Sequence, residues 1–334
     1  MSQGDVPSPQ LINQYLSGHW ASIALAAAVE YSVFTRIERG EDTCAALARA
    51  AGISTRGAQG LLDGLVGLGL LTTAGGRYAT TRESSFYLVE GKPAYLGAWA
   101  TRLLGPDGEL ALWTALPDIV KRGRRAEPLV LAEAPFWDKL VVALIPAAWP
   151  VAQHVGARLG FASLGPVRML DVGGGAGVYS AALLTANPQA RSTQVDWANV
   201  NRIARDYVGK MGVGERFETR DGDLHEVDFG AGIYDLAIYS HIAHGLSPEQ
   251  NAAAFRRLRR ALAPGGTLIV VDFVVNEDRS GPPFALLFHL QMLIGTPEGA
   301  TWRESDYRRW LGDAGFTRID VEPTPTGPTA IFAR

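Results

Sequence analysis

Residues 167–177 read Val-Arg-Met-Leu-Asp-Val-Gly-Gly-Gly-Ala-Gly, and this stretch decides the fold. Mostly apolar residues lead into Asp171, a glycine cluster follows, and the helix-like run 178–186 comes directly after it. We interpret the stretch as a buried strand, a turn too tight for side chains, and the start of a helix. Glycines let the backbone approach a ligand closely, and a helix start offers unpaired N–H groups. The pattern therefore predicts a binding site for an adenosine-like ligand.

From Pro166 onwards, segments typical of strands alternate with segments typical of helices. The expected strands cover residues 168–172, 192–196, 217–220, 234–239 and 267–273. One of the helices between them, over 248–263, is expected to end at Pro264-Gly265-Gly266. Strand–helix alternation implies a parallel, doubly wound sheet. The predicted fold class is therefore α/β with a Rossmann-like sheet, and segments 316–321 and 329–332 are expected to add an antiparallel hairpin at its edge.

The first quarter of the chain has a different pattern, with helices and one hairpin. The expected elements are long helices within 11–37, a short helix over 43–52, a helix over 55–71 and a hairpin over 72–80 that turns at Gly75-Gly76. This order is typical of a winged helix-turn-helix. We therefore divide the chain into a winged-helix domain (1–90), a mainly helical region rich in aromatic residues (91–164) and the α/β domain (165–334).

Composition sets limits on the class of protein. The chain has 334 residues, 47% of them hydrophobic and 19% charged, so two domains with substantial cores are expected. A net charge of −3 gives no general attraction to nucleic acid or to anionic membranes. The single cysteine, Cys44, excludes an intrachain disulfide or a cysteine-based zinc site. We see neither a signal peptide nor an apolar run of the roughly 18 residues that span a bilayer, and expect a cytoplasmic protein.

The glycine turn differs from a dinucleotide-binding motif. Gly173, Gly175 and Gly177 alternate, but Val178 stands where the third glycine of Gly-x-Gly-x-x-Gly is required. Asp171 precedes the glycines by two residues, close to where a pyrophosphate would bring negative charge. A carboxylate at this place suits a ligand that carries an ammonium group, as S-adenosylmethionine does.

Two further acids follow the next two expected strands. Asp196 ends its strand, where a carboxylate accepts hydrogen bonds from ribose hydroxyls. Asp223 is expected to accept from an adenine amino group, while Leu224 covers the ring and Trp197 offers a second packing surface for the adenosine. A single aspartate at such a position often only caps a loop. Three acids at the carboxyl ends of consecutive strands are more specific, because open α/β sheets bind ligands at that edge.

Taken in order, these motifs resemble the S-adenosylmethionine-dependent O-methyltransferases of the plant caffeate and acetylserotonin type and their bacterial natural-product relatives. The resemblance covers nearly the whole chain. It includes the winged-helix outline, Leu-Asp-Val-Gly-Gly-Gly-Ala-Gly at 170–177, Val-Asp-Trp at 195–197 in place of Asp-Leu-Pro, Gly-Asp-Leu at 222–224, and Leu-Ala-Pro-Gly-Gly at 262–266. It implies S-adenosylmethionine as cofactor, with Tyr239 and Ser240 among its contacts, and a homodimer formed through the N-terminal domain.

The same resemblance implies a catalytic residue. His244 matches the family's general base, although Gly245-Leu246 follows where the family has Asp-Trp. A phenol and an ordinary histidine differ by ~3.5 in pKa, roughly 5 kcal/mol, and a carboxylate beside the imidazole reduces that gap. Asp272 lies where the family has the glutamate that orients this histidine, and its shorter side chain is expected to bond directly or through water. A second family glutamate is missing: Gly-Ala-Thr-Trp occupies its place at 299–302, with Glu298 as a possible substitute.

Other interpretations of this segment stay open. His244 also suits a loop residue that caps the following helix. His241 and His244 suit a metal pair, but the expected third ligand is missing and the glutamate of His-Glu-x-x-His is absent, so we predict no metal. The changed surroundings of His244 also leave open a different reaction with the cofactor retained: C- or N-methylation, hydroxylation or a pericyclic reaction.

The acceptor is expected to be a small aromatic or polyketide-like compound that is methylated on a hydroxyl. Segment 283–294 resembles the family helix that lines the acceptor pocket, with Phe288, His289 and Met292 as contacts. Phe136, Trp149 and His154 precede the α/β domain, where family members close over the substrate. Such an apolar, aromatic wall suits a flat acceptor.

A winged helix also occurs in DNA-binding proteins. The would-be recognition helix from Ser54 to Leu71 offers Arg56 as its single cation and is otherwise rich in glycine and aliphatic residues. Binding to phosphates needs several Lys or Arg residues. We therefore expect this domain to pack against a second copy of the chain, with no nucleic-acid or membrane partner.

Overall fold

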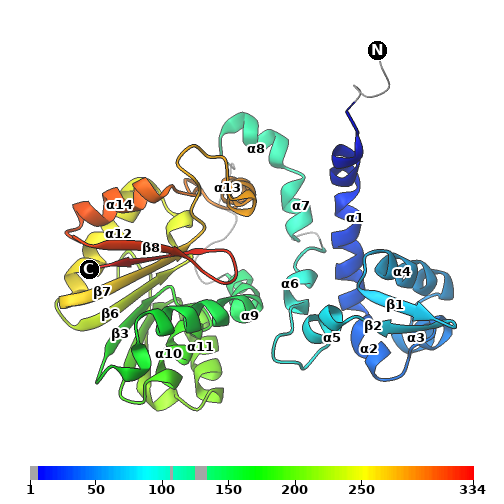
Figure 1. Cartoon of the computed structure of the whole chain (residues 1–334), viewed down its shortest axis with the longest axis horizontal. Coiled ribbons are helices and arrows are strands. Elements are labelled where there is room, and N and C mark those ends of the chain that lie inside the picture. The colour runs from blue at the N-terminus through cyan, green and yellow to red at the C-terminus, as the bar shows by residue number, and fades with distance from the viewer. Residues whose placement is uncertain (1–6, 106–107, 125–133) are drawn as a thin grey trace. The chain divides into compact units, whose positions relative to one another are not determined.

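The computed structural model describes residues 7–105, 108–124 and 134–334 (Figure 1). The chain forms two compact units, Met1–Thr114 and Ala115–Arg334. The helical region predicted between the two domains is shared by both units, since its first helices belong to the first unit and its last to the second. The three-part division of the chain stays a prediction.

The first unit contains the expected helices and the two-stranded wing. Its elements are α1 (Gln10–Glu30), α2 (Val33–Glu38), α3 (Cys44–Ala51), α4 (Thr55–Gly67), β1 (Leu71–Ala74), β2 (Arg77–Thr80), α5 (Arg82–Leu88), α6 (Gly97–Thr101) and α7 (Glu109–Trp113). Thr43 and Ser54 cap α3 and α4 by accepting hydrogen bonds from backbone N–H groups of the first turn. Helix α4 ends earlier than predicted because Leu71 already pairs with Thr80 in the wing.

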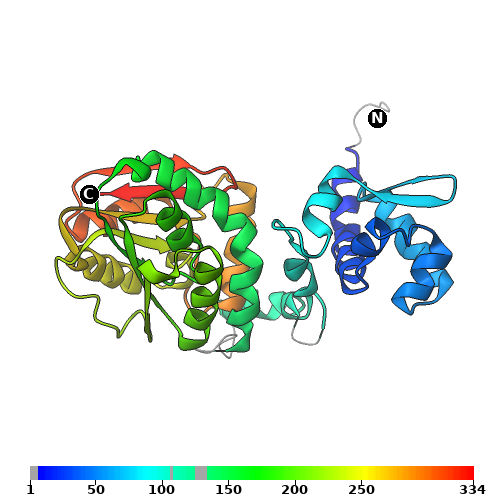
Figure 2. The ribbon, with the colours of Figure 1, turned by 90° about the horizontal axis from the view of Figure 1, so that it is seen from below.

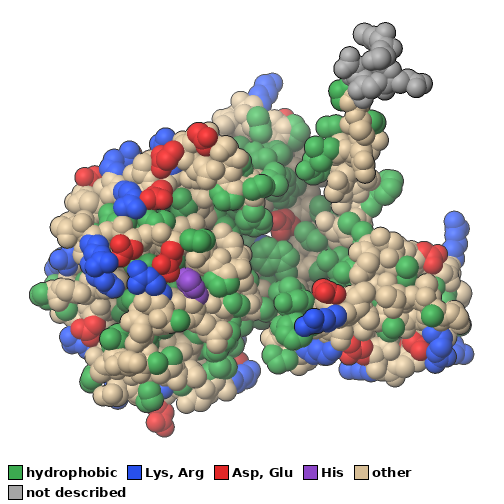
Figure 3. All heavy atoms as spheres, viewed as in Figure 1, with side chains coloured by type: hydrophobic (Ala, Val, Ile, Leu, Met, Phe, Trp, Pro, Cys, Tyr) green, Lys and Arg blue, Asp and Glu red, His purple; other side chains and the backbone are tan. Residues whose placement is uncertain are grey.

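Helix α1 carries an exposed apolar face. Leu16 and Trp20 are 70% and 69% exposed, and further apolar residues of the helix are exposed beside them: Leu11, Ile12, Tyr15 and Ile23. Hydrophobic side chains accordingly gather along this helix in Figure 3. Contiguous exposed apolar surface of this kind marks a protein–protein contact. The helix thus presents a surface that an isolated chain leaves uncovered.

The second unit is the predicted α/β domain. Its helices are α8 (Leu116–Arg122), α9 (Pro135–Arg158), α10 (Val178–Ala186), α11 (Ala198–Lys210), α12 (Pro248–Ala261), α13 (Pro283–Gly295) and α14 (Glu304–Asp313). Its strands are β3 (Arg168–Val172), β4 (Arg191–Asp196), β5 (Phe217–Asp221), β6 (Tyr234–Ser240), β7 (Leu262–Asp272), β8 (Ile319–Pro323) and β9 (Thr329–Ala333). Helix α12 stops at Ala261, two residues before the predicted end, because β7 already begins at Leu262.

The seven strands lie in the order β5-β4-β3-β6-β7-β9-β8. Strands β3 to β7 are mutually parallel, and β9 pairs antiparallel with both β7 and β8. The predicted doubly wound sheet with an antiparallel edge hairpin is therefore confirmed. Because the order reverses between β3 and β6, the carboxyl ends of these strands border the crevice where such sheets bind ligands.

Each face of the sheet has its own core. Alternate residues of β3 divide between them: Met169 packs with α9, α10 and α11, whereas Leu170 packs with α12 and α14. These two helical layers are visible in Figures 1 and 2. Both cores hold the sheet rigidly, so the loops at its carboxyl edge start from fixed positions.

Helix α9 corrects one expectation. Residues Phe136–Arg158 are long and apolar enough to cross a membrane by length and composition, although no such run was expected. The second half of the helix instead buries Val151, Ala152 and Val155 in the core under the sheet. His154 and Arg158 of the same helix pair with Glu322 of β8. These contacts identify α9 as a core helix of the α/β domain.

Candidate active site

The glycine turn after β3 has the tight geometry that its sequence requires. Gly173, Gly175 and Gly177 have φ values of +65°, +58° and +76°, which side-chain-bearing residues rarely adopt. A Cβ atom on Gly173 would lie 2.4 Å from the side chain of Ile242, in the loop after β6. The turn therefore brings bare backbone to the carboxyl edge of the sheet.

Asp196 holds this turn in place. Its Oδ2 accepts a hydrogen bond from the N–H of Gly175 (2.9 Å) and its Oδ1 accepts one from the N–H of Trp197 (2.8 Å). Burial raises the pKa of Asp196 to about 6, against the lowering effect of these two hydrogen bonds. The carboxylate thus lies at the end of β4, as predicted for a ribose-binding acid, and it also fixes the glycine turn.

Asp171 lies beneath the turn and is completely buried. A Cβ atom on Gly174 would lie 2.8 Å from its carboxyl carbon. Oδ2 accepts a hydrogen bond from Ser180 (2.7 Å), whereas Oδ1 has no partner among the described residues. Burial raises its pKa to about 6, partly offset by Ser180. The carboxyl group therefore keeps one acceptor oxygen next to the backbone that would meet a cationic ligand.

The other predicted cofactor contacts lie around the same edge. Asp223 accepts a hydrogen bond from the N–H of His225 (2.7 Å) and so shapes its own loop, and the carbonyl of Leu224 accepts from Arg257. Trp197 packs beside Val178 and Val200, at the first turns of α10 and α11. Tyr239 is fully buried and its hydroxyl has no partner among the described residues, whereas the hydroxyl of Ser240 interacts with that of Tyr179.

These features together fit a nucleoside cofactor with a positively charged end. The turn offers bare backbone, Asp196 lies on the β4 side of it, and the buried Oδ1 of Asp171, on β3, has no partner among the described residues. Buried polar atoms in folded proteins are normally paired, so this oxygen indicates a missing ligand or ordered water.

The second part of the site is the pair formed by His244 and Asp272. His244 lies in a 3₁₀ turn (Ala243–Gly245) after β6, and Asp272 ends the adjacent strand β7. Nδ1 of His244 lies 2.6 Å from Oδ1 of Asp272, and the backbone N–H of His244 donates to Oδ2 (3.1 Å). The bond is therefore direct. The His244 side chain is 13% exposed, whereas that of Asp272 is fully buried.

Asp272 is held by four hydrogen bonds. Besides His244, the N–H of Phe273 donates to Oδ1 (2.8 Å) and the hydroxyl of Tyr307 donates to Oδ2 (3.1 Å). Burial by itself raises the pKa of Asp272, but the charge and hydrogen bond of His244, together with His241 and the Phe273 N–H, bring that pKa below its usual value. The group is a carboxylate at neutral pH. As it can only accept hydrogen bonds, Nδ1 of His244 carries a proton, and in the neutral form of the ring the lone pair is on Nε2.

Two N–H groups from residues 299–302, the segment in which the second glutamate is missing, support the His244 turn. The N–H of Ala300 donates to the carbonyl of His244 (2.8 Å), and Nε1 of Trp302 donates to the carbonyl of Ala243 (2.9 Å). A Cβ atom on Gly299 would lie 2.4 Å from the His244 carbonyl oxygen, so this approach requires glycine. Glu298 is exposed. The second support of the His244 turn is therefore a pair of N–H groups.

The structure also bears on the alternative interpretations of His244. Helix α12 is capped by Ser247, which accepts from the N–H of Gln250 in a reciprocal capping box, so the helix does not use His244 as its cap. The expectation that a metal pair lacks a third ligand was wrong, because Asp272 lies with His241 and His244 in one cluster. Both oxygens of Asp272 already accept two hydrogen bonds each, and a metal would have to displace them.

Of the predicted acceptor contacts, Phe288 touches His244 directly. Its ring meets the His244 imidazole edge to face at a centroid distance of 4.9 Å. Met292 lies buried on the same helix, and Nδ1 of His289 accepts from the N–H of Thr301 at 3.3 Å. All three residues therefore lie on α13, and Phe288 among them contacts His244.

The predicted contacts on α9 lie in different surroundings. Trp149 packs against the core that contains Val141 and Ala176, and the ring of Phe136 meets that of Trp137. His154 lies nearer the other end of the helix, and its Nε2 is 2.9 Å from Oε1 of Glu322 in β8. This partner, 168 positions away in the sequence, gives His154 a structural contact that sequence analysis did not foresee.

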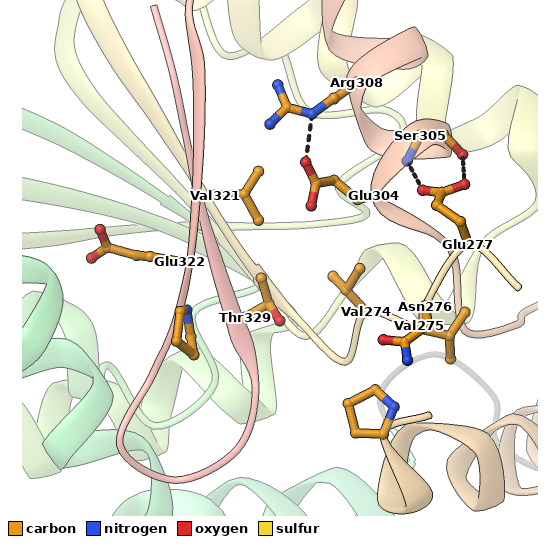
Figure 4. Close-up of a pocket in the computed structure, with 12 residues that line it drawn as sticks. Val274, Val275, Asn276, Glu277, Glu304, Ser305, Arg308, Val321, Glu322 and Thr329 are labelled. Atoms are coloured by element: carbon orange, nitrogen blue, oxygen red, sulfur yellow. Dashed lines mark hydrogen bonds and ion pairs between the residues drawn. The ribbon is translucent and has the colours of Figure 1, made fainter. Parts of the chain in front are cut away.

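A hollow of about 650 Å³ lies between the end of β7, the start of α14 and the β8–β9 hairpin (Figure 4). None of the predicted site residues lines it. Charged side chains that line it already have partners within the lining: Arg308 forms an ion pair with Glu304 (2.6 Å), and Glu277 accepts hydrogen bonds from the N–H and hydroxyl of Ser305. We therefore assign the chemistry to the edge that carries His244.

The sequence analysis did not predict the parts that two residues play in the site. Tyr307, in α14, reaches Asp272 across the fold, and no local pattern distinguishes it from a core tyrosine. His241 was considered only as a metal ligand. Its left-handed backbone (φ +58°) and its place beside His244 are visible only in three dimensions.

Comparisons with known proteins agree with this geometry. The family model of the O-methyltransferase domain matches residues 153–317, and that of the O-methyltransferase dimerisation domain matches residues 13–90. The 3-hydroxy-5-methyl-1-naphthoate 3-O-methyltransferase of Streptomyces sahachiroi is 29% identical over 93% of this chain and 90% of its own length. A solved structure from Nostoc punctiforme, described as a proposed O-methyltransferase, is 32% identical, with a TM-score of 0.90 and coverage of 98% and 99%.

Solved structures of relatives include complexes with the cofactor. Human N-acetylserotonin methyltransferase, in complex with S-adenosylmethionine, is 26% identical to this chain. Its TM-score is 0.82, and the match covers all of this chain and 99% of that one.

Proposed function

The chain belongs to the O-methyltransferase family, and from this premise we propose that it moves the methyl group of S-adenosylmethionine to a hydroxyl of a small fused-ring aromatic or polyketide-like natural product, with His244 as the general base. The activity class and the cofactor follow from the family. The role of His244 and the class of acceptor are our proposals. They are supported chiefly by the direct 2.6 Å contact between His244 and a fully buried carboxylate.

The protein's task in this reaction is to hold and to deprotonate the acceptor. Bound S-adenosylmethionine supplies an electrophilic methyl carbon on a positively charged sulfur. Asp272 accepts the Nδ1 proton of His244, so Nε2 is the basic atom that receives the proton of the acceptor hydroxyl. The imidazolium that results lies against the Asp272 carboxylate, which stabilises its charge in surroundings from which water is largely excluded. Positioning of the hydroxyl is left to the aromatic surface around the base.

The class of acceptor is supported by the rings that surround His244. Phe288 of α13 packs edge to face on the imidazole. Phe273, directly after β7, contacts the rings of both Phe288 and Phe284, and Phe284 also lies on α13. Phe284 is 59% exposed, which leaves apolar ring surface open to a ligand. The relatives include enzymes named for a hydroxynaphthoate and for a tetracenomycin polyketide, both with hydroxyl-bearing fused rings.

We further propose that the active form is a homodimer through the N-terminal unit. The dimerisation model matches residues 13–90, and α1 within this range presents the exposed face of Leu16 and Trp20.

Transfer of an isotopically labelled methyl group from S-adenosylmethionine to a panel of hydroxynaphthoates tests the proposal. His244→Gln should lower kcat by about 10²- to 10⁴-fold, as expected for the loss of a general base. Cofactor affinity measured by calorimetry should stay within about twofold, because a lost hydrogen bond to the cofactor would weaken binding at least that much. His225→Gln, at an exposed histidine, is the matched control and should behave as the wild type. Unlabelled product, or equal losses of kcat and cofactor affinity, would contradict the assignment.

A further inference from the structure

His241 is a half-buried histidine next to the base that the proposed proton transfer does not use. Its backbone has φ +58°, and its N–H donates to the carbonyl of Val271 (2.8 Å), which continues the pairing of β6 with β7. Residues other than glycine seldom adopt this conformation, and where they do, the strain often serves a functional site. The end of β6 thus holds the His241 side chain at the carboxyl edge of the sheet.

The imidazole of His241 closes a circuit of four rings. It lies 5.0 Å from Phe273, Phe273 lies 4.8 Å from Phe288, and Phe288 lies 4.9 Å from His244. The two imidazoles are 6.0 Å apart, which is the widest contact of the circuit. Two apolar rings therefore flank two rings that can form hydrogen bonds, on the surface where we place the acceptor.

The chemistry of His241 suits a hydrogen bond to a neutral ligand. Burial lowers its pKa to about 4, helped by His244 and opposed by Asp272. The ring is therefore uncharged at neutral pH and offers one N–H donor and one acceptor nitrogen. Within the described part of the chain, its side chain makes ring contacts but no hydrogen bond. The ring nitrogens of this half-buried side chain are therefore available to a ligand.

We propose that His241 is a second polar contact for the acceptor, which hydrogen-bonds an oxygen on the carbon next to the reacting hydroxyl and so favours aromatic acceptors with two neighbouring oxygens. This inference rests on the proposed function, because it takes His244 as the site of the reacting hydroxyl. The two imidazole centroids are 6.0 Å apart, and one nitrogen of each ring lies within 4.8 Å of the other and of an Asp272 carboxylate oxygen. Neighbouring oxygens on one aromatic ring lie about 2.7 Å apart, so each can meet its own imidazole at about 2.8 Å.

The test compares 2,3-dihydroxynaphthalene with 2-naphthol, which lacks the second oxygen. Binding is measured by calorimetry to protein saturated with S-adenosylhomocysteine, so no turnover is needed. The wild type should bind the diol about threefold to tenfold more tightly than the naphthol, as one added neutral hydrogen bond predicts. His241→Phe keeps the ring contact with Phe273 but removes both nitrogens, and it should lose this preference while binding 2-naphthol as before.

A second variant guards against failure to fold. Glycine adopts a positive φ without strain, so His241→Gly removes the imidazole and relaxes the backbone. It should show the same loss of preference. An affinity ratio that stays at the wild-type value in both variants, or an equal loss of affinity for the two acceptors, would overturn the proposal. If the wild type keeps the binding preference but transfers no labelled methyl group, the proposed function fails instead.

Discussion

Replacing Asp272 with asparagine tests the part of the site on which the mechanism depends most. Each carboxylate oxygen accepts two hydrogen bonds: Oδ1 from Phe273 N–H and His244 Nδ1, Oδ2 from His244 N–H and the Tyr307 hydroxyl. An amide keeps one accepting oxygen and puts an NH₂ group in place of the other. Two of the four donors therefore face another donor, whichever way the amide is turned.

The two orientations have different chemical results. With NH₂ in the place of Oδ1, His244 must accept at Nδ1, its proton moves to Nε2, and the base has no lone pair for the acceptor; the Phe273 N–H is left unpaired. With NH₂ in the place of Oδ2, the tyrosine hydroxyl can rotate to accept, but the His244 N–H is left unpaired. One buried backbone donor loses its partner in both cases, at a cost of about 1–3 kcal/mol in the free energy of unfolding.

Turnover should suffer in either orientation. The first gives the wrong tautomer, and the second removes the negative charge that stabilises the imidazolium. We expect kcat to fall by about 10²- to 10⁴-fold, with unchanged affinity for the cofactor. Asp306→Asn is the matched control, since Asp306 is 5% exposed and pairs with Arg303 and Arg309 on α14 without contacting His244. It should lose stability but not turnover. A folded Asp272→Asn protein with kcat within threefold of the wild type would refute proton transfer through this pair.

Three other changes give separate tests. Gly299→Ala puts a Cβ atom 2.4 Å from the His244 carbonyl, so the turn must move and kcat should fall about tenfold or more; Gly312→Ala, a helical glycine with open space around it, should keep full activity and gain up to about 1 kcal/mol of stability. Asp171→Asn removes an acid whose pKa is raised to about 6. Because the raised pKa makes the charged form unfavourable in the folded protein, the free energy of unfolding of the wild type falls as the pH rises from about 4 through 6. The variant does not lose it, so by pH 7.5 the difference in free energy of unfolding should have moved by about 3 kcal/mol in favour of the variant in denaturant titrations. The variant should also bind S-adenosylmethionine more weakly, and equal pH dependence of the two proteins would contradict the assignment. Leu16→Asp combined with Trp20→Asp, on the exposed face of α1, should give a monomer in sedimentation. Its melting temperature in calorimetry should lie below that of the dimer, because subunit association stabilises the folded chain; an intact dimer would place the interface elsewhere.

The fold was predictable because its signals are local. Strand β3 begins and ends at the predicted residues, since an apolar run followed by a glycine turn specifies both limits without help from distant parts of the chain. The end of α12 was misplaced by two residues because the pairing of Leu262 with Tyr234 in β6, and not Pro264-Gly265, stops the helix. Long-range pairing decides such boundaries, and sequence periodicity does not report it.

The site residues also fall into those that could be predicted from the sequence and those that depend on long-range contacts. The acids at the ends of β3, β4 and β7 were predictable because the topology of a parallel sheet gathers strand ends at one edge. The pairing of His154 with Glu322 was not, since it depends on how α9 crosses β8. Nor was the strain at His241, because a histidine in a loop has no pattern that reveals a positive φ.

The two departures from the family pattern near His244 are connected. Aspartate in place of glutamate at 272 shortens the orienting side chain by one methylene, and Gly-Ala-Thr-Trp at 299–302 replaces the segment that carries the second glutamate. Gly299 has no Cβ, so the loop 296–302 lies close against the turn, where the Ala300 N–H and the Trp302 indole N–H each donate to one of its carbonyls. Held from that side, the turn lies close enough to β7 for the shorter carboxylate to reach both Nδ1 and N–H of His244 without a bridging water. Asp272 and the loop 296–302 support the base together, so Asp272→Glu, which restores the longer side chain at one of the two places only, should lower turnover rather than raise it.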